Sequence, residues 1–206
     1  MTDPLLDIRD FRLHFDTFDG EHKALDGVNI SVARGETVGA TLGNDVNLRD
    51  FEGRSALLLG KTKDNNASTA LGPFIRLLDE SFTLDRLRQT TISLRVAGED
   101  GFELTGTSSM AEISRDITDL VGQTYGPNHQ YPDGFILFAG TMFAPIEDRD
   151  APGQGFTHKL GDLVTISCPE LGGLTNRVTT CDKAPPWTFG PGALMRNLAA
   201  RGLLSG

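Results

Sequence analysis

The stretch Thr91-Ile-Ser-Leu-Arg-Val-Ala-Gly-Glu-Asp-Gly-Phe-Glu-Leu-Thr105 decides the fold class of this 206-residue chain. Apolar and polar residues alternate over residues 91–96, which is typical of a strand with one buried face. Gly98-Glu-Asp-Gly101 follows as a turn signal, and residues 102–105 resume the strand pattern. The segment therefore predicts a β-hairpin.

Further strand signals lie on both sides of this hairpin. Alternation from Ile8, an Asp19-Gly20 turn signal and a second strand over residues 28–32 predict a hairpin or meander in residues 1–35. Later strands are predicted over residues 135–138, 163–167 and 174–179, with a Gly172-Gly173 turn between the last two.

Two segments have the 3.6-residue periodicity of amphipathic helices. They are residues 108–123, with an apolar face of Met110, Ile113, Ile117, Leu120 and Val121, and residues 193–204 near the end of the chain. Strand signals outnumber helix signals, and 24 glycines against 10 prolines suit turn-rich β structure. The sequence therefore predicts a strand-dominated α+β fold.

Composition excludes several classes of protein. The net charge of −9 repels phosphate backbones, so no nucleic-acid partner is expected. No run of 18 apolar residues predicts a membrane span, and the first residues lack the basic and apolar regions of a secretory signal. Two cysteines exclude a disulfide framework, and none of the four histidines has metal-ligand spacing from another. A cytoplasmic location is expected.

The segment Gly43-Asn-Asp-Val-Asn-Leu-Arg-Asp-Phe-Glu-Gly53 is dense in chemically active groups. On an extended chain Asp45, Asn47 and Arg49 share one face, so a group that binds cations lies beside one that binds carboxylates. A solvated acidic loop with an Arg–Asp surface pair is the alternative, and spacing alone favours it because charge clusters are usually solvated.

Two other places offer groups for binding or catalysis. Lys61 and Lys63 follow the apolar run of residues 56–59, and a lysine at the end of a buried strand can be desolvated into a base, although it more often extends into water. Gly140-Thr141, after the predicted strand 135–138, offers an amide and a hydroxyl to an anion, or is a plain strand end.

Several separate stretches, in characteristic order, resemble a known family. They are Gly43–Gly53, Gly60-Lys-Thr-Lys63, Ala70-Leu-Gly-Pro73, Gly106-Thr-Ser-Ser-Met110, Ile113-Ser-Arg-Asp116, Gly140-Thr141 and Asn176-Arg-Val178. Residues 41–204 resemble the C-terminal catalytic part of the fumarylacetoacetate hydrolase family, in particular its 2-keto-3-deoxy sugar acid dehydratase branch.

The first residues resemble a different family. Pro4-Leu-Leu-Asp-Ile-Arg-Asp-Phe-Arg-Leu-His-Phe15, Ala24-Leu-Asp-Gly-Val28 and Arg34-Gly-Glu-Thr-Val-Gly39 are similar to the opening strands of an ABC-transporter ATPase. In that family Gly-Glu-Thr-Val-Gly continues into the phosphate loop, but here it continues into Ala40. The two resemblances imply an ATPase-like β-hairpin segment over residues 1–39 and a hydrolase-like domain, truncated at its N-terminal side, over residues 40–206.

The hydrolase resemblance implies a β-roll, a divalent cation such as Mg²⁺, a 2-oxo acid substrate and a homodimer. Matched residue by residue, Asp45 corresponds to a metal ligand, Arg49 to a substrate-facing arginine and Thr141 to the threonine that holds the substrate carboxylate. Lys63 corresponds to the catalytic lysine in preference to Lys61.

The chain departs from the family at the metal site. The other two family ligands form a Glu-x-Glu pair upstream of the aspartate, and no Glu-x-Glu precedes Asp45 here. Asp19-Gly20-Glu21 has an acid-x-acid spacing, but Asp-Gly is the stronger signal for a hairpin turn. The β-roll is therefore expected to be incomplete and the metal weakly held, because cation affinity follows ligand charge.

The favoured hypothesis is a metal-dependent lyase or hydrolase-type domain acting on a 2-oxo acid, most like a 2-keto-3-deoxy sugar acid dehydratase and impaired by loss of the Glu-x-Glu ligands. The alternatives are a non-catalytic gene-fusion product and a C–C bond hydrolase of acylpyruvate or diketo-acid type. An ATP-binding fragment is the least favoured, because the glycines of Gly53-Arg-Ser-Ala-Leu-Leu-Leu-Gly60 have six residues between them where the phosphate loop requires four.

Overall fold

The computed structural model describes residues 6–17, 20–32, 37–52, 54–141, 143 and 145–204. Its strands are β1 (Leu6–Thr17), β2 (Gly20–Val32), β3 (Gly39–Asp45), β4 (Thr69–Leu77), β5 (Thr91–Ala97), β6 (Glu103–Ser109), β7 (Leu163–Cys168) and β8 (Gly172–Arg177). Its helices are α1 (Arg49–Glu52), α2 (Leu59–Lys63), α3 (Leu84–Arg88), α4 (Ile117–Thr124) and α5 (Pro191–Ala200), with 3-10 turns η1 (Ala56–Leu58) and η2 (Met110–Glu112). The strand-dominated α+β prediction is confirmed.

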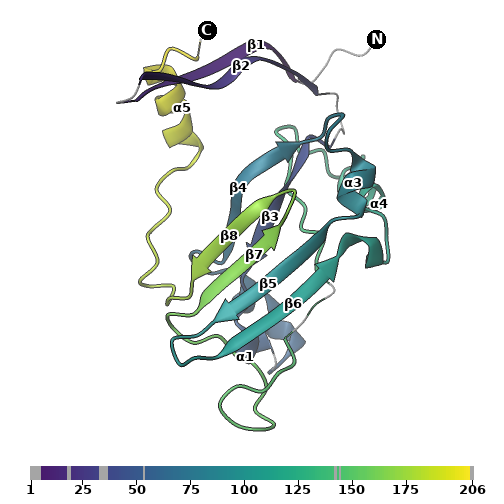
Figure 1. The fold of residues 1–206 in the computed structure, drawn as a ribbon, viewed down its shortest axis with the longest axis vertical. Helices are drawn as coiled ribbons and strands as arrows, with labels where there is room; N and C mark the ends of the chain where they lie inside the picture. The colour runs from purple at the N-terminus through teal and green to yellow at the C-terminus, as the bar shows by residue number, and fades with distance from the viewer. Residues whose placement is uncertain are drawn as a thin grey trace.

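A four-stranded antiparallel sheet in the order β6-β5-β7-β8 forms one layer of the molecule (Figure 1). The β5–β6 hairpin predicted from residues 91–105 is present, and so is the β7–β8 hairpin. Val96, which is fully buried, pairs with Leu104 on one side and Val164 on the other. The alternating apolar residues of three strands thus meet in one cluster, to which Phe156 also belongs.

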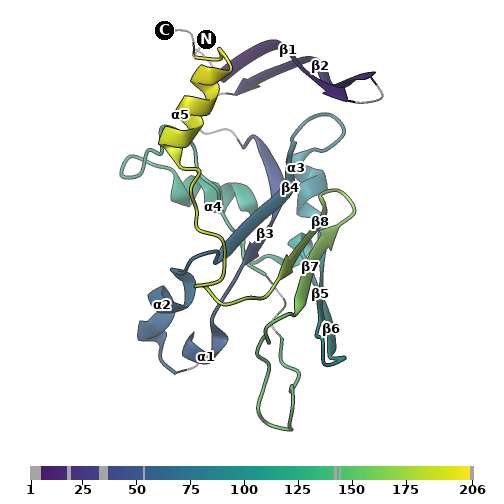
Figure 2. The ribbon, with the colours of Figure 1, turned by 90° about the vertical axis from the view of Figure 1, so that its left-hand side faces the viewer.

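The β3–β4 ribbon forms the second layer and packs against β7 and β8 (Figure 2). A second core cluster lies between the layers and includes Leu42 of β3, Phe82, Leu87 of α3, Cys168 of β7 and Leu171. Because Leu42 is only 2% exposed, β3 is fixed against the larger sheet by burial of this side chain.

β4 has no counterpart among the strands predicted from the sequence. Gly72-Pro73 lies in its middle, and such a pair is a signal against a regular strand. The structure accommodates the proline at an irregularity in the pairing, where the register shifts between Ala40 and Leu42. Proline is tolerated at such places because no ladder hydrogen bond is needed there.

The apolar run of residues 135–138 was wrongly predicted as a buried strand, and the apolar run of residues 56–59 does not form a strand either. Residues 56–59 lie in η1 and the start of α2, with Leu57 95% exposed. Residues 135–138 belong to a loop in which Ile136 is 59% exposed. A run of four apolar residues has no period of its own, so it cannot distinguish a strand from a turn of helix or an apolar loop.

The helix predicted over residues 108–123 is divided in the structure. Ser109 caps the short turn η2, Ile113 is extended, and α4 begins only after Asp116, whose carboxylate accepts a hydrogen bond from the Thr118 amide at 2.9 Å. A second capping residue inside the apolar pattern therefore starts a new helix. The terminal helix is present as α5, and no helix in the described part is long and apolar enough to cross a bilayer.

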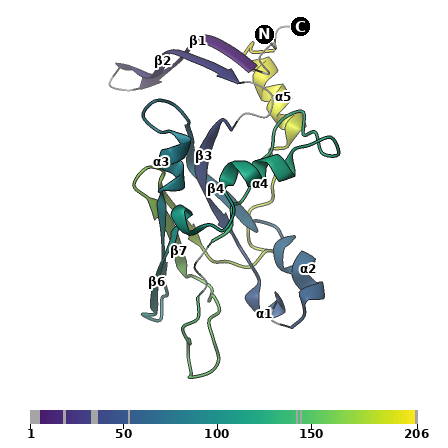
Figure 3. The same ribbon diagram turned by 90° about the vertical axis from the view of Figure 1, so that its right-hand side faces the viewer.

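β1 and β2 pair antiparallel and lie at one end of the molecule, with α5 beside them (Figures 1 and 3). Asp19, part of the predicted turn, lies outside the described residues. The predicted domain boundary after residue 39 falls where β3 begins and remains a prediction.

A buried arginine anchors the long loop between α4 and β7. The Arg149 side chain is 2% exposed and donates to Asp162 at 2.6 and 2.9 Å and to Asp100 at 3.0 and 3.2 Å. Its guanidinium also lies 4.5 Å from the centroid of the Phe102 ring. The clamp therefore ties the loop to the β5–β6 turn and to the start of β7.

Arg149→Met is expected to lower the free energy of unfolding by about 3–5 kcal/mol, because it removes the guanidinium that balances the charge of the buried Asp162 carboxylate. Arg115→Met is the matched control: Arg115 pairs with Asp119 at the surface, where a pair contributes about 0.5 kcal/mol or less. Urea unfolding followed by circular dichroism measures both. Equal stability of the two variants would show that the clamp is not structural.

Stability should also fall in acid. Burial opposes ionisation of Asp162, but hydrogen bonds from Arg149 and the Lys159 amide outweigh it and leave the pKa of Asp162 below its ordinary value. A carboxyl with a lowered folded pKa stabilises the fold above its unfolded pKa, and this contribution is lost as pH falls through the folded value. Unfolding free energy should therefore decrease from about pH 5 to pH 2, and less steeply in Asp162→Asn. An equal slope in both proteins would contradict this.

Candidate active site

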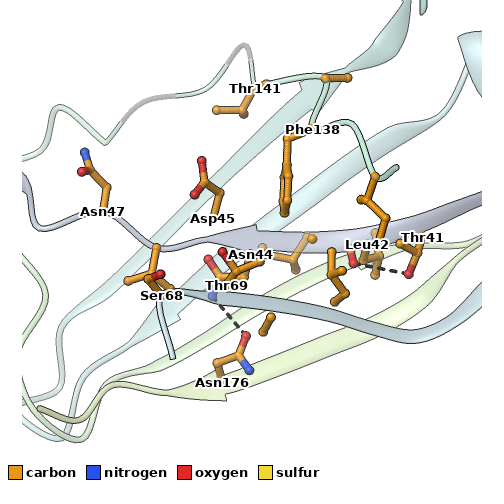
Figure 4. Close-up of a pocket in the computed structure, with 18 of the residues that line it drawn as sticks. Thr41, Leu42, Asn44, Asp45, Asn47, Ser68, Thr69, Phe138, Thr141 and Asn176 are labelled. Carbon is orange, nitrogen blue, oxygen red and sulfur yellow. Dashed lines mark hydrogen bonds between the residues drawn. The ribbon is translucent and has the colours of Figure 1, made fainter. Parts of the chain in front are cut away.

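β3 supplies the first residues of the candidate site. Side chains alternate between its two faces, so Leu42 and Asn44 point toward the larger sheet and Gly43 and Asp45 toward the opposite side. Asn44 donates to the Asn176 side chain in β8 at 3.1 Å (Figure 4). The Asp45 carboxylate, at the end of the strand, is 46% exposed and free of the core.

Lys63 lies against Asp45 although 18 positions separate them in the sequence. Its Nζ is 2.7 Å from Asp45 Oδ2 and 3.4 Å from the Asp45 carbonyl oxygen. Two backbone hydrogen bonds bring the segment that contains α1 and α2 back to the end of β3. The Leu48 amide donates to Thr62 O at 3.2 Å, and the Val46 amide donates to Ser68 O at 2.9 Å. Lys63 is thus placed at the site by a helix end and not by a strand end.

Lys61 takes a different position. Its Nζ lies 4.6 Å from the centroid of the Phe51 ring, a cation–π contact that directs it to the α1 side of this segment. The geometry therefore favours Lys63 over Lys61 as the lysine of the site. Arg49 is the first residue of α1, four positions after Asp45, and its side chain lies outside the described part of the chain.

Thr141 reaches the same cavity from the loop between α4 and β7. Figure 4 shows it on the wall facing Asp45, with Phe138 standing over β3 beside them. Thr141 Oγ1 accepts a hydrogen bond from the Phe143 amide at 3.2 Å. Oγ1 also donates to the Phe143 carbonyl oxygen at 3.4 Å. The hydroxyl is therefore held by the local backbone, and it donates to a ligand only in exchange for this long bond.

The cavity that these residues line has a volume of about 1860 Å³. Small-molecule pockets usually measure roughly 300–1,000 Å³, so a small acid would fill only part of this space. Most of the lining is apolar, and the polar groups include Asn44, Asp45, Lys63 and Thr141. An apolar cavity with a few converging polar groups is typical of a ligand site.

The described residues do not fit a magnesium site. Among them, no group of three or more histidine, cysteine, aspartate or glutamate side chains is close enough to share a metal ion. Asp45 is paired with the Lys63 ammonium, which neutralises the charge that a dication would need. Asp19 and the side chain of Glu21, the acid-x-acid candidates, lie outside the described part.

Sequence reasoning missed two contacts that shape the site. Asn44 and Asn176 both lie in motifs that carried the resemblance, but nothing in the sequence indicates that they bind each other across 132 positions. Phe138 belongs to the run that the sequence predicts as a buried strand, whereas its ring lies against Gly43. An apolar run followed by Gly140 was the available signal for a loop rather than a strand.

Comparison with known proteins places this geometry in a family. The description "Fumarylacetoacetate (FAA) hydrolase C-terminal" matches residues 23–179, so the match begins inside the segment expected to be ATPase-like. A Haloferax volcanii protein named "Probable 2-keto-3-deoxyxylonate dehydratase" is 27% identical over 154 residues, which are 74% of this chain and 49% of that protein. A 2-dehydro-3-deoxy-D-arabinonate dehydratase from Saccharolobus solfataricus is 28% identical over 149 residues, 71% of this chain and 45% of that protein.

A solved structure gives the same picture of the fold. A 2-keto-3-deoxy-D-arabinonate dehydratase complexed with magnesium and 2,5-dioxopentanoate matches with a TM-score of 0.57 and 28% identity, over 68% of this chain and 46% of that chain. The chain thus spans about half the length of the relatives it matches. The fold, the order of the motifs and the family match over more than half of the residues agree, and the chain belongs to the fumarylacetoacetate hydrolase family, in the part that corresponds to its C-terminal domain.

Proposed function

We propose that this chain binds a 2-oxo acid at the Asp45–Lys63 site and is a lyase-type domain for 2-keto-3-deoxy sugar acids, with turnover impaired by loss of the Glu-x-Glu metal ligands. One observation carries the proposal: Lys63 Nζ lies 2.7 Å from Asp45, and Thr141 lines the same cavity. Three residues selected by the family resemblance, distant in sequence, thereby share one space. The dehydratase names of the matched relatives support the substrate class.

The chain's own residues have distinct tasks in this proposal. The Thr141 hydroxyl donates to the substrate carboxylate, and Arg49, which begins α1 beside the site, supplies a second anion-binding group. Dehydration requires transfer of a proton from C3 to a base, here one supplied by the solvent. The electron pair of the enolate then expels the C4 hydroxyl as hydroxide, and the proton and the hydroxide leave as water. The Lys63 ammonium stabilises the negative charge that develops on the enolate oxygen.

Asp45 keeps Lys63 in place and balances its charge. The pair is close to neutral as a unit, so it repels a carboxylate less than Asp45 alone would. No step is assigned to a cation, because the described donors do not form a site for one. We therefore expect that substrate binding is retained to a greater extent than turnover.

A non-catalytic gene-fusion product is the second candidate, and the single lysine-paired carboxylate favours it. Dehydration is preferred to C–C hydrolysis because the matched relatives are dehydratases. The ATPase-like origin of residues 1–39, a homodimer and a cytoplasmic location belong to the proposal on sequence grounds alone.

Magnesium binding should be weak, with a dissociation constant of roughly millimolar order, since one carboxylate supplies little of the charge that such a site needs. Asp45→Asn should abolish the heat of binding in titration calorimetry, and Asp64→Asn, a nearby acid outside the pair, should not. Lys63→Met should strengthen binding because it removes the competing ammonium. A tight site that survives Asp45→Asn would refute the placement of the ligand.

Enzymes typically turn over at about 1 s⁻¹ or faster. The turnover of 2-keto-3-deoxy-D-arabinonate by this chain should be orders of magnitude slower. Formation of 2,5-dioxopentanoate in the presence of magnesium measures it, and Lys63→Ala should reduce any residual rate further. A rate near 1 s⁻¹ would show that another group has replaced the lost ligands.

Binding provides an independent test of the site. Pyruvate, followed by NMR titration, should bind the wild-type chain, and Thr141→Val should weaken it by about 2- to 12-fold, the effect of one lost hydrogen bond. Thr105→Val is the matched control, because Thr105 is an exposed threonine of β6 outside the cavity. Equal affinity in the wild type and Thr141→Val would exclude Thr141 from the site.

A further inference from the structure

The loop that carries Thr141 is held on the sheets by two aromatic rings, each seated on a glycine. Phe138 lies three residues before Thr141 and Phe143 two residues after it. The first ring rests on Gly43 of β3 and the second on Gly106 of β6. Thr141 is therefore bracketed by contacts to both layers of the fold.

The contact at Gly43 leaves no room for a side chain. A Cβ atom placed there would lie 2.4 Å from Phe138 Cε1 and 3.0 Å from Cζ, whereas real Cβ atoms essentially never come within 3.0 Å of another residue's atom. Gly43 and Asp45 lie on the same face of β3 because they are two residues apart. The Phe138 ring consequently stands next to the Asp45 side chain (Figure 4).

The contact at Gly106 is equally close. A Cβ atom there would lie 2.4 Å from Phe143 Cζ and 2.5 Å from both Cε atoms. Phe143 also packs against the core cluster of the larger sheet, which includes Val96 and Leu104. Since the Phe143 amide donates to Thr141 Oγ1 at 3.2 Å, the seat of this ring also fixes the hydroxyl.

Neither glycine is needed for its backbone conformation. Both Gly43 and Gly106 are strand residues whose φ lies outside the left-handed region. Alanine is ordinarily better than glycine inside a strand. The space for the ring is therefore the property that the structure requires at these two positions.

We infer that Gly43 and Gly106 are positioning residues, which seat Phe138 and Phe143 and thereby hold Thr141 over Asp45. This inference rests on the proposed function for the role of Thr141, whereas the docking of the loop is independent of it. Neither glycine has a side chain that could bind a ligand. The two glycines affect ligand binding only because they determine the position of the Thr141 hydroxyl.

The experiment replaces each seat by alanine in the full chain. Gly43→Ala and Gly106→Ala should release the loop, so that amide hydrogen exchange of residues 138–141 and 143 speeds up by at least about tenfold, while β7 amides exchange as before. Gly173→Ala is the matched control, because Gly173 is a strand glycine of β8 with nothing within 4 Å of a built Cβ. Unchanged exchange in both seat variants, or equal acceleration in the control, would overturn the inference.

Pyruvate binding then distinguishes positioning from a general structural effect. Each seat variant should bind pyruvate about as weakly as Thr141→Val does, and Gly106→Ala combined with Thr141→Val should be no weaker than either alone, because all three lose the same contact. Additive losses in the double variant would contradict the inference. Adding Phe143→Leu to Gly106→Ala replaces the ring by a smaller side chain, which makes room for the alanine methyl group. The double variant should therefore regain part of the affinity for pyruvate.

The two proposals fail in different ways. If the wild-type chain binds no 2-oxo acid, the proposed function fails, and the exchange measurements still decide whether the glycines seat the loop. If the seat variants bind pyruvate normally while exchange accelerates tenfold, the glycines hold the loop in place as inferred. The position of Thr141 then does not affect binding, and the positioning role is refuted.

Discussion

Burial of Leu42 is the constraint on which the rest of the structure depends. This side chain joins β3 to α3 and to the β7–β8 hairpin in one apolar cluster, and so sets which face of β3 looks toward the larger sheet. A slip of one residue would turn every side chain of a strand to the other face. Asp45 would then point at β8, and Asn44 would lose its partner Asn176.

The candidate site is assembled from three segments with no local relation to one another. β3 brings Asp45, the end of α2 brings Lys63, and the α4–β7 loop brings Thr141. A different kind of contact places each residue. Asp45 is placed by burial of its strand, Lys63 by the backbone hydrogen bonds that close the α1–α2 segment, and Thr141 by aromatic rings that pack on glycines. The loop is in addition clamped at its far end by the buried Arg149.

The described groups of the site do not suit a dication. An aspartate in ionic contact with a lysine presents little net charge, and the hydroxyl of Thr141 lines the same cavity. The relatives, of which the match covers about half, include a dehydratase structure complexed with magnesium and 2,5-dioxopentanoate. In this chain the described groups form no metal site, which is why the proposed function separates binding from turnover.

The sequence by itself determined the strand-dominated class and the hairpins of β5–β6 and β7–β8, because alternation and turn residues are local signals. Only the tertiary structure decided that residues 56–59 are helical and that residues 135–138 lie in a loop, since four apolar residues have no period and take their conformation from what covers them. The motifs indicated the candidate site residues, but they did not indicate that Lys63 contacts Asp45 or that the Phe138 ring packs against Gly43. Those contacts depend on how loops close and layers pack, and side-chain periodicity along one segment contains no information about its partner in another.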